Sequence, residues 1–472
     1  MAALAMGFTA CEDYSTTAVP QSNPQLPAMD AESLVVAPGD TVADLAAQEA
    51  VAVLNVVEVK DLPEVASLEF VMEMAKTEDF ANAKSVATSV AENVVYVASA
   101  DWQAAHLEVF GKNPKAQDTY VRFAPYVVNG TSKVRLNNAE YYIGASKVNV
   151  TPYPAPFFID EVYNLEANGV VVAELKGEKG DVYDNPNFKA AVTIAVDDII
   201  DGETWAWRIV AKNAAEGTER TVFAPNIDFA DAEEGVLETN VDGYVPGYGN
   251  FPIDGRWIFS FNAETLAFSI KEAPAEMNMI GGFCGWNWGN APSMIRVNSH
   301  PGLYWTIQYV NAGEGFKFNA SRAWDGGEFG YGSQVGETVA EVVNDGGNFA
   351  VTEAGWYIFV IDNTTGVPVL SILEPNVYVI GGAVGGWNIE DKNKFEIVGD
   401  RDAEWPFVSP EVASSELRLC IKLDDCEWWQ TEFIFFEDGN IEYRADGGDQ
   451  ERYTCPAGKV YLNFVTGKGK VE

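Results

Sequence analysis

The sequence predicts an all-β protein built from tandem β-sandwiches. The main observation is a hairpin pattern that occurs three times in the second half of the chain, beginning at Gly255, Gly355 and Gly458. Each time, alternating apolar residues are followed by a polar turn and a second short strand, as is typical of a β-hairpin. The starts recur about every 100 residues, which is the size of one small domain rather than of a solenoid repeat. A hydrophobic content of 47% and an aromatic content of 12% indicate a folded chain with substantial cores.

Prolines and changes of composition divide the chain into five segments. The Pro-rich stretch 151–156 cannot enter a sheet ladder and marks one boundary, and Pro274 and Pro375 mark two more. The predicted segments are a leader and tether at 1–30, an N-terminal sandwich at 31–153, and three copies of one β-module at 157–273, 275–374 and 375–472. We refer to these copies as modules 1, 2 and 3.

The chain begins with small apolar residues that end at Cys11. Small residues before a cysteine resemble the lipobox of bacterial lipoproteins, in which the cysteine carries the lipid. The acidic pair Glu12-Asp13 resembles the export signal of surface lipoproteins, so we expect lipidation of Cys11 followed by a flexible tether. The alternative is a free cysteine in a disordered leader. No later stretch of about 20 apolar residues occurs, which favours a lipid anchor without a membrane-spanning helix.

The N-terminal segment has the alternation of a sandwich domain. Residues 50–59 and 67–74 are strand-like, with apolar side chains at every second position of the latter run. Residues 120–130 resemble the F-strand of fibronectin type III domains, with Gly130 opening a turn. An immunoglobulin- or fibronectin III-like sandwich is therefore predicted for residues 31–153.

Modules 2 and 3 begin with the same motif. Residues 279–287, Met-Ile-Gly-Gly-Phe-Cys-Gly-Trp-Asn, align with residues 379–388, Val-Ile-Gly-Gly-Ala-Val-Gly-Gly-Trp-Asn, with one inserted residue. The pattern indicates a strand that runs into a glycine-rich loop, and this loop presents Trp286 in one module and Trp387 in the other. It is not a dinucleotide-binding fingerprint, because no helix follows it.

A strand in the middle of each module carries the second part of the pattern. The phenylalanines on either side of Lys317 are expected in the core of module 2, so Lys317 faces outward. The alignment places Arg418 at this position in module 3, with Lys422 on the same face, and Ala206 at this position in module 1. Because module 1 lacks both the base and the glycine-rich tryptophan loop, we expect its site to be degenerate or structural.

Modules 2 and 3 thus combine an outward base with loop tryptophans, which suits a sugar ligand. The apolar face of a pyranose stacks on an indole ring, and burying about 80 Å² in this way contributes roughly 2 kcal/mol. A Lys or Arg that donates to hydroxyl groups adds about 1–2 kcal/mol, so tandem sites of about millimolar strength would hold a polymer through avidity. The candidate residues are Trp286, Trp288, Lys317 and Trp324 in module 2, and Trp387, Arg418, Lys422, Trp428 and Trp429 in module 3.

Tryptophans within alternating strands have a simpler explanation in core packing. The loop tryptophans stand in polar or glycine-rich segments, where a large apolar side chain is unfavourable in water unless it contacts something. Trp288 fits either role. We expect core packing for Trp257, Trp305, Trp356 and Trp405.

Charge and composition exclude several functions. The chain has 30 Lys and Arg against 70 Asp and Glu, a formal charge of −40, which disfavours nucleic acid and anionic membrane surfaces as partners. Two histidines without a partner pattern and five cysteines without metal-ligand spacing disfavour a His-based catalytic centre or a zinc site, and we expect no metal or cofactor. Cys426 has two alternatives, a disulfide with Cys420 or Cys455 or a free thiol.

Together these features resemble the SusE/SusF family of outer-membrane starch-binding lipoproteins. The resemblance rests on Cys11, the N-terminal sandwich, and the Ile-Gly-Gly starts and Gly-x-aromatic ends of the modules; three modules correspond to the SusF type, since SusE has two. It implies non-catalytic, surface-exposed binding of α-glucans by carbohydrate-binding modules, beside a TonB-dependent transporter and its glycan-binding lipoprotein. It also implies a site of Trp286, Lys317 and Trp324 in module 2. In module 3 it implies a site of Trp387 with Arg418 or Lys422 and with Trp428 or Trp429.

Three alternatives remain from the residues alone. The first is a surface protein for a different polysaccharide, and the second is a structural adhesin or scaffold whose tryptophans pack in protein interfaces. The third is a glycoside hydrolase, which would use paired carboxylates such as Asp197 and Asp198, or Asp424 and Asp425. We expect no catalytic residues, because a module of about 100 residues offers little room for a deep catalytic cleft.

Overall fold

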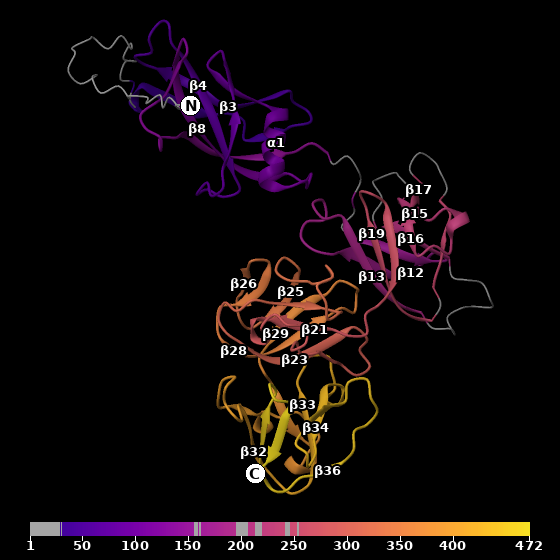
Figure 1. The fold of residues 1–472 in the computed structure, drawn as a ribbon. Coiled ribbons are helices and arrows are strands. Elements are labelled where there is room, and N and C mark those ends of the chain that lie inside the picture. The colour runs from indigo at the N-terminus through magenta and orange to yellow at the C-terminus, as the bar shows by residue number, and fades with distance from the viewer. Residues whose placement is uncertain are drawn as a thin grey trace, which may run out of the picture. The chain divides into compact units, whose positions relative to one another are not determined.

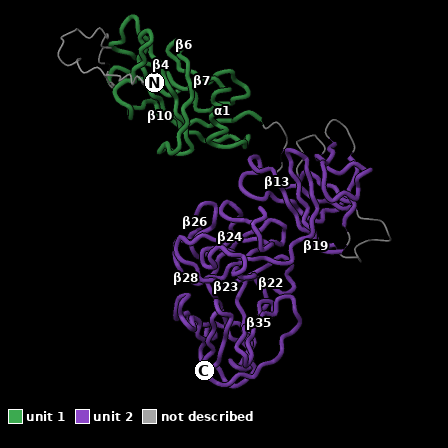
Figure 2. Tube along the Cα trace, in the orientation of Figure 1, with its two compact units in different colours: residues 1–156 green, residues 157–472 purple. Residues whose placement is uncertain are grey.

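The computed structural model describes residues 29, 31–154, 159, 162–194, 206–212, 220–240, 246–252 and 254–472. The chain divides into two compact units, residues 1–156 and 157–472 (Figure 2). Strands make up most of the regular structure in both units (Figure 1), so the all-β prediction is confirmed. Cys11, Asp197 and Asp198 lie outside the described residues, and with them the predicted lipobox and one candidate carboxylate pair.

Unit 1 is a sandwich of two sheets. Its strands are β1 (Leu34–Pro38), β2 (Val42–Asp44), β3 (Ala50–Val59), β4 (Ser67–Ala75), β5 (Lys84–Ala87), β6 (Ser89–Ala91), β7 (Val94–Ala98), β8 (Gln117–Asn129), β9 (Ser132–Arg135) and β10 (Ile143–Thr151). One sheet has the order β1-β3-β7-β6, and the other has the order β2-β10-β8-β4-β5 with β9 beside β8. The predicted strands are confirmed as β3, β4 and β8, and Gly130 opens a turn with φ of 59°.

A single α-helix occurs in the described residues, α1 (Ser99–Phe110), and it was not expected from the sequence. Trp102 and His106 lie one turn apart on its buried side and attach the helix to unit 1. His106 stacks on Phe110 with 4.7 Å between ring centroids, and its two nitrogens have no hydrogen-bond partner among the described residues. Burial, together with the positive charge of Lys76, lowers the pKa of His106 to about 4. No helix in the described part of the chain is long and apolar enough to cross a membrane.

Module 1 is one continuous sheet that curls around a single core. Its strands are β11 (Val162–Ala167), β12 (Val170–Gly177), β13 (Asn187–Ile194), β14 (Ala206–Ala211), β15 (Val222–Ala224), β16 (Glu234–Val236), β17 (Glu238–Thr239), β18 (Gly249–Asn250), β19 (Gly255–Asn262) and β20 (Ala267–Glu272). Their order is β16-β20-β19-β13-β12-β11-β14-β15-β17, with β18 beside β14. Three strands separate β14 from β19 in this order, yet the Trp207 and Phe259 rings have centroids 5.4 Å apart, so the sheet curls over and these two strands face each other across the core.

Module 2 is a sandwich of two sheets around an aromatic core. Its strands are β21 (Asn278–Gly281), β22 (Ile295–Arg296), β23 (Leu303–Val310), β24 (Phe316–Asn319), β25 (Gln334–Thr338), β26 (Val342–Asp345), β27 (Asn348–Val351), β28 (Gly355–Asp362) and β29 (Val369–Leu373). One sheet has the order β21-β24-β27-β26 and the other β22-β23-β28-β29-β25. Phe316 and Phe318 are buried between the sheets, as predicted for the residues that flank Lys317.

Module 3 repeats this arrangement. Its strands are β30 (Val377–Ile380), β31 (Glu396–Ile397), β32 (Phe407–Val412), β33 (Glu416–Ile421), β34 (Glu432–Phe435), β35 (Ile441–Tyr443), β36 (Tyr453–Thr454), β37 (Gly458–Asn463) and β38 (Lys468–Val471). One sheet has the order β30-β33-β34-β35 with β36 beside β33, and the other has the order β31-β32-β37-β38. The three predicted hairpins are confirmed as the antiparallel pairs β19–β20, β28–β29 and β37–β38.

Modules 2 and 3 share a second core. The sheet that contains β23 and β28 is apolar on both faces, and its outer face packs against module 3, which these strands adjoin in Figure 1. Trp356 meets Phe407 with centroids 5.1 Å apart, and Trp305 meets Tyr443 at 5.6 Å. The core packing predicted for Trp305 and Trp356 is therefore confirmed, but the core belongs to two modules rather than one.

The other two tryptophans that we expected in strands are half-buried, and Trp405 lies just before β32 rather than in it. Trp257 packs against the core of module 1. Trp405 lies beside Tyr461 in module 3, and the ammonium group of Lys470 is 5.0 Å from the centroid of the Trp405 ring. Core packing accounts for the first of these side chains, whereas the second belongs to an aromatic and basic group at the module surface.

Candidate functional site

The pairing of strands shows which residues of modules 2 and 3 correspond. Lys317 on β24 pairs with Ile280 on β21, and Arg418 on β33 pairs with Ile380 on β30. Each isoleucine directly precedes the glycine at which the glycine-rich loop begins. Lys317 and Arg418 are therefore at the same place in the two modules, as the alignment predicted.

The same comparison corrects the alignment of module 1. On β14, Trp207 and Ile209 are buried and flank Arg208, in the same way that two buried phenylalanines flank Lys317. Arg208 pairs with Glu166, the penultimate residue of β11. The prediction that Ala206 occupies the base position is wrong, and module 1 has a base at this position after all.

The glycine-rich loops of modules 2 and 3 form short 3₁₀ helices, Gly282–Cys284 and Gly382–Val384. In module 2 the backbone N–H of Trp286 donates to the carbonyl of Gly281 at 3.0 Å, and in module 3 the N–H of Gly386 makes the equivalent bond to Gly381 at 3.1 Å. The inserted glycine thus takes the place of Trp286, and Trp387 follows it. Trp286 itself is held at φ of 55°, a left-handed conformation that costs a bulky residue about 1–2 kcal/mol.

Three indole rings come together in module 2. The Trp286 and Trp324 rings have centroids 6.2 Å apart and are inclined by 35°, and the Trp288 and Trp324 rings are 5.2 Å apart. Trp324 is 56% exposed, and the other two are half-buried. Lys317 is half-buried beside Gly330, whose lack of a side chain leaves space for the lysine stem, and it has no ion-pair partner among the described residues.

A hydrogen-bonded loop holds Trp324 in place. The Asp325 carboxylate accepts hydrogen bonds from the Ser321 hydroxyl, from Asn319 Nδ2 at 2.9 Å and from the backbone N–H of Gly327 at 2.9 Å. These bonds, that of Ser321 above all, lower the pKa of Asp325 to about 2. The loop is therefore ordered at neutral pH by a charged group that the sequence did not single out.

Arg322 supports the neighbouring Trp288 loop. Its guanidinium donates to the carbonyl oxygens of Trp288 at 3.0 Å and Ala291 at 2.9 Å, and to Ser293 Oγ at 2.6 Å. This arginine stands two residues before Trp324 in the chain, so one short segment supplies both an exposed ring and the group that positions the adjacent ring. Sequence reasoning did not single out Arg322 as a supporting residue, and its position two residues before Trp324 was the feature that could have indicated this role.

Module 3 contains a second pair of rings. The Trp387 and Trp428 rings have centroids 5.4 Å apart and are inclined by 34°. Trp387 is 46% exposed, whereas Trp428 packs one side on a small apolar cluster that includes Tyr378 and Cys420. Trp428 begins a short 3₁₀ helix, Trp428–Thr431, whose Thr431 hydroxyl donates to the carbonyl of Ile421 at 2.6 Å.

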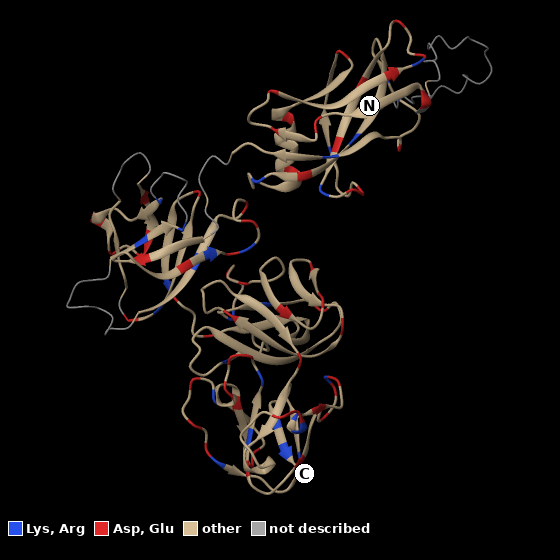
Figure 3. Cartoon of the chain, turned by 180° about the vertical axis from the view of Figure 1, so that it is seen from behind, with Lys and Arg blue, Asp and Glu red and all other residues tan. Residues whose placement is uncertain are grey.

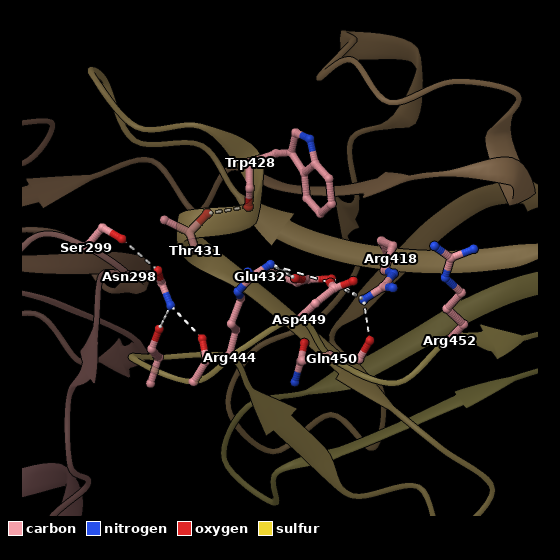
Figure 4. Close-up of polar contacts among 12 residues, drawn as sticks. Asn298, Ser299, Arg418, Trp428, Thr431, Glu432, Arg444, Asp449, Gln450 and Arg452 are labelled. Carbon is pink, nitrogen blue, oxygen red and sulfur yellow. Dashed lines mark hydrogen bonds and ion pairs between the residues drawn. The ribbon is translucent and has the colours of Figure 1, made fainter.

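Arg418 does not face outward, and this prediction is wrong. Its side chain is 2% exposed, and its Nη1 lies 2.6 Å from Oε1 of Glu432, which is fully buried. The other Glu432 oxygen pairs with Arg444 at 3.0 Å, and Asp449 lies 3.6 Å from both arginines (Figure 4). The base of module 3 is thus neutralised beneath the loop that carries Asp449.

The other two candidates of module 3 lie in different surroundings. Lys422 is exposed and lines a cavity of about 510 Å³ together with residues of module 2 such as His300. Trp429 is half-buried, and the guanidinium of Arg444 lies 5.0 Å from its ring centroid. Among the described residues, the aromatic pair of this site therefore consists of Trp387 and Trp428, and it does not include Trp429.

Module 1 has a pocket on the equivalent sheet face. The pocket has a volume of about 430 Å³ and is lined by Arg208, Arg220, Glu166 and Tyr248, among others. Arg220 pairs with Glu166 at 2.9 Å, and Arg208 Nε donates to the carbonyl of Gly247 at 2.8 Å. An exposed tyrosine thus stands near the base, where modules 2 and 3 have paired tryptophans.

The described residues contain no group of three or more His, Cys, Asp or Glu side chains placed to hold a metal ion. Cys284, Cys420, Cys426 and Cys455 are free thiols, which decides between the two alternatives for Cys426. Burial raises the pKa of Cys426, and the charges of Asp425 and Asp424 raise it further. These features leave the aromatic pairs as the main chemical feature of modules 2 and 3.

Paired, partly exposed indole rings on the loops of a β-sandwich are suited to stacking on sugar rings, as expected of a carbohydrate-binding module. Residues 276–367 and 376–470 each match the family described as SusF/SusE starch-specific carbohydrate-binding modules, so modules 2 and 3 are similar to the modules of that family. Over 99% of its length the chain is 28% identical to Outer membrane protein SusF of Bacteroides thetaiotaomicron, 97% of which is covered. The resemblance to the SusE/SusF family is thereby confirmed.

A solved structure supports the fold of the whole chain. The crystal structure of SusF from Bacteroides thetaiotaomicron superposes with a TM-score of 0.51 over 93% of this chain and 99% of that chain, at 23% sequence identity. This similarity agrees with the tandem β-domains that the described residues form.

Proposed function

We propose that the protein binds starch or related α-glucans at the cell surface without catalysing their cleavage. The observation that carries this proposal is the recurrence of two inclined indole rings at the same place in modules 2 and 3, Trp286 with Trp324 and Trp387 with Trp428. The family of these modules is described as starch-specific, and the whole-length relative is named an outer membrane protein, which supports both the ligand and the location.

The shape of the ring pairs favours a curved glucan. The two rings of each pair are inclined by 35° and 34°, so neither pair offers one flat surface. An α-1,4-linked glucan coils, and successive sugar rings turn relative to one another, whereas a β-1,4-linked glucan is extended and flat. A bent platform can stack on two successive rings of the coiled chain, which contributes roughly 2 kcal/mol for each ring.

The supply of hydrogen-bond donors differs between the modules. Lys317 is accessible in module 2 and can donate to vicinal hydroxyl groups, whereas Arg418 of module 3 is engaged by Glu432. We therefore propose Trp286, Trp288, Trp324 and Lys317 as the more selective site. In module 3, stacking on Trp387 and Trp428 supplies most of the affinity, with Lys422 and Trp429 at most peripheral.

Module 1 contributes a third and weaker site in this proposal. Its pocket holds Arg208 at the base position and Tyr248 as an exposed ring. A tyrosine presents less stacking area than a pair of indoles, so the affinity for one sugar unit should be lower. Several weak sites on one chain still raise the apparent affinity for a polymer, because the second contact is intramolecular.

The proposal includes a lipid anchor at Cys11 and an outer-membrane uptake system. Asp and Glu are distributed over both units (Figure 3), and the charge of −40 presents no obstacle to a neutral polysaccharide. A surface-bound glucan would be passed to a TonB-dependent transporter and its glycan-binding lipoprotein. Replacing Cys11 with Ala and fractionating the cells tests the anchor, since the variant should leave the outer membrane.

Affinity electrophoresis on a polysaccharide panel tests the ligand. We expect retardation in gels that contain starch but not in gels that contain levan or xylan. The double variant Trp286→Ala, Trp387→Ala should migrate faster in starch, whereas the buried control Trp305→Phe should migrate as the parent. Equal mobility of the double variant and the parent would remove the site assignment, and retardation by another polysaccharide alone would change the ligand.

The same panel tests the absence of catalysis. Paired carboxylates at the separations used by glycosidases would release reducing ends from one of the polysaccharides. We expect no release of reducing sugar from starch during prolonged incubation. Release that is abolished by replacing Asp424 or Asp425 would overturn the non-catalytic proposal.

A further inference from the structure

We propose that Asn298 of module 2 is a positioning residue for the Trp387–Trp428 platform of module 3. This inference rests on the proposed function, because it concerns one of the proposed glycan platforms. It goes beyond that function because it makes the module 3 platform dependent on a side chain that belongs to the preceding module.

Asn298 is bonded through its backbone to the helix that presents Trp428. Its N–H donates to the carbonyl of Gln430 at 2.9 Å, and its own carbonyl accepts from Gln430 Nε2 at 3.1 Å. The Gln430 Oε1 atom in turn accepts from the N–H of Glu427 at 2.7 Å. One glutamine side chain therefore connects module 2 to the residue that directly precedes Trp428.

The Asn298 side chain holds a second element of module 3. Its Nδ2 donates to the carbonyl oxygens of Ala445 at 2.5 Å and Gly447 at 2.9 Å. These residues belong to the segment between Arg444 and Asp449, whose side chains close the ion-pair cluster around Arg418 (Figure 4). Asn298 thereby fixes the loop that covers the base position of this site.

All the hydrogen-bonding groups of Asn298 are in use. The fourth group, Oδ1, accepts from Ser299 Oγ at 2.9 Å, and the residue as a whole is buried. Ser299 adopts φ of 61°, so the turn that carries Asn298 has a defined and locally unfavourable backbone conformation. Removing the side chain would take the Nδ2 donor from the carbonyl oxygens of Ala445 and Gly447, which it reaches through two part-buried hydrogen bonds across the junction of the modules.

The geometry of the ring pair depends on these anchors. The helix Trp428–Thr431 has only four residues, so its few side-chain contacts decide the orientation of the Trp428 ring. Thr431 holds its end through the carbonyl of Ile421, and Gln430 holds it through Asn298. Asn298→Ala keeps the backbone bonds to Gln430 but releases the turn that carries them from Ala445 and Gly447. We expect this loosening to change the inclination of Trp428 toward Trp387, and the stacking of two successive sugar rings depends on that inclination.

Fluorine NMR of the full chain labelled with 5-fluorotryptophan tests the structural part directly. A Trp428→Phe variant assigns the resonance of Trp428. We expect this resonance to shift or broaden in Asn298→Ala, and also in Asn298→Asp, which retains the size but places a carboxylate against two carbonyl oxygens. The control is Arg296→Gln, which breaks the Arg296–Asp446 ion pair of 2.5 Å at the same junction but leaves Asn298 in place. An unshifted Trp428 resonance in both Asn298 variants would overturn the inference.

Calorimetric titration with maltoheptaose tests the consequence for binding. Replacing Trp286 and Trp324 with Ala removes the platform of module 2, so that the affinity of module 3 can be measured. In this background Asn298→Ala should weaken glucan binding about fivefold or more, whereas Arg296→Gln should leave it unchanged. In a Trp387→Ala, Trp428→Ala background, the affinity of module 2 should be unchanged by Asn298→Ala. Equal losses in both modules would indicate general unfolding and overturn a positioning role. A module 3 background that binds no glucan would count against the proposed function, while the fluorine spectrum would still decide the role of Asn298.

Discussion

Lys317 and Arg418 occupy equivalent positions, yet their replacement by Met should have opposite effects. Met retains most of the aliphatic stem and removes the charge. Arg418→Met leaves Glu432 fully buried with Arg444 as its remaining close partner at 3.0 Å. Breaking a buried ion pair costs about 3–5 kcal/mol, and we expect the lower value because Arg444 remains. For a cooperative pair of modules this is a fall of roughly 6–12 °C in the unfolding midpoint.

Lys317→Met removes a half-buried ammonium group that has no ion-pair partner among the described residues. The free energy of unfolding should therefore change by no more than about 0.5 kcal/mol. The affinity of module 2 for an α-glucan should fall roughly 5- to 30-fold, which corresponds to about 1–2 kcal/mol of lost charge-assisted hydrogen bonds.

Two measurements on the parent and on each variant separate these effects. Thermal unfolding followed by tryptophan fluorescence reports the stability, and calorimetric titration with maltoheptaose reports the affinity of one module when the rings of the other are replaced by Ala. An unchanged midpoint for Arg418→Met, together with lost binding in module 3, would show that Arg418 contacts the ligand. The account of a neutralised base would then be wrong.

Three further predictions concern single groups. Trp286→Gly should weaken glucan binding but leave the unfolding free energy of module 2 unchanged or raise it by up to about 1 kcal/mol, because φ of 55° suits glycine. Chemical denaturation measures this effect, and Trp387→Gly is the control that should show no gain, because Trp387 lies outside the left-handed region. Asp325 has a pKa near 2, below its ordinary value, so its loop bonds should persist above pH 4 and be lost as the pH falls toward 2; a fluorescence titration should show this transition in the parent but not in Asp325→Asn. The folded-state pKa of His106, about 4, lies below its unfolded value of about 6.5, so protonation favours the unfolded state. The unfolding free energy of unit 1 should therefore fall by about 3 kcal/mol between pH 6.5 and 4. Urea denaturation at a series of pH values should show a smaller dependence of this free energy on pH for His106→Phe.

The parts of the fold that follow from local patterns were predictable. The three hairpins and the tryptophan-bearing loops depend on alternation and on glycine, both of which are visible in one short stretch of sequence. Helix α1 was missed because its buried side consists of Trp102, Ala105 and His106 with small or polar residues between them, which is a weak apolar pattern.

Two errors in the site arose from contacts between separate strands. Shifting the alignment of module 1 by two residues keeps every side chain on the same face, so Ala206 and Arg208 are equally good candidates until the strand pairing is known. Arg418 was expected to face solvent because alternation along its own strand does not reveal its acidic partner. Glu432 lies on the neighbouring strand β34 and comes next to Arg418 only in the folded sheet. Alternation alone tells which face a residue takes, but not what covers that face.

The core shared by modules 2 and 3 limits how these modules can be duplicated or exchanged. Strand β28 is a nearly unbroken apolar run because neither of its faces meets water. A duplication that adds or exchanges a single copy of such a domain would leave Trp305 and Trp356 uncovered, or would place a new surface against them. We therefore expect genetic rearrangements among relatives to transfer modules 2 and 3 together, and cut points to fall before β21 rather than before β30.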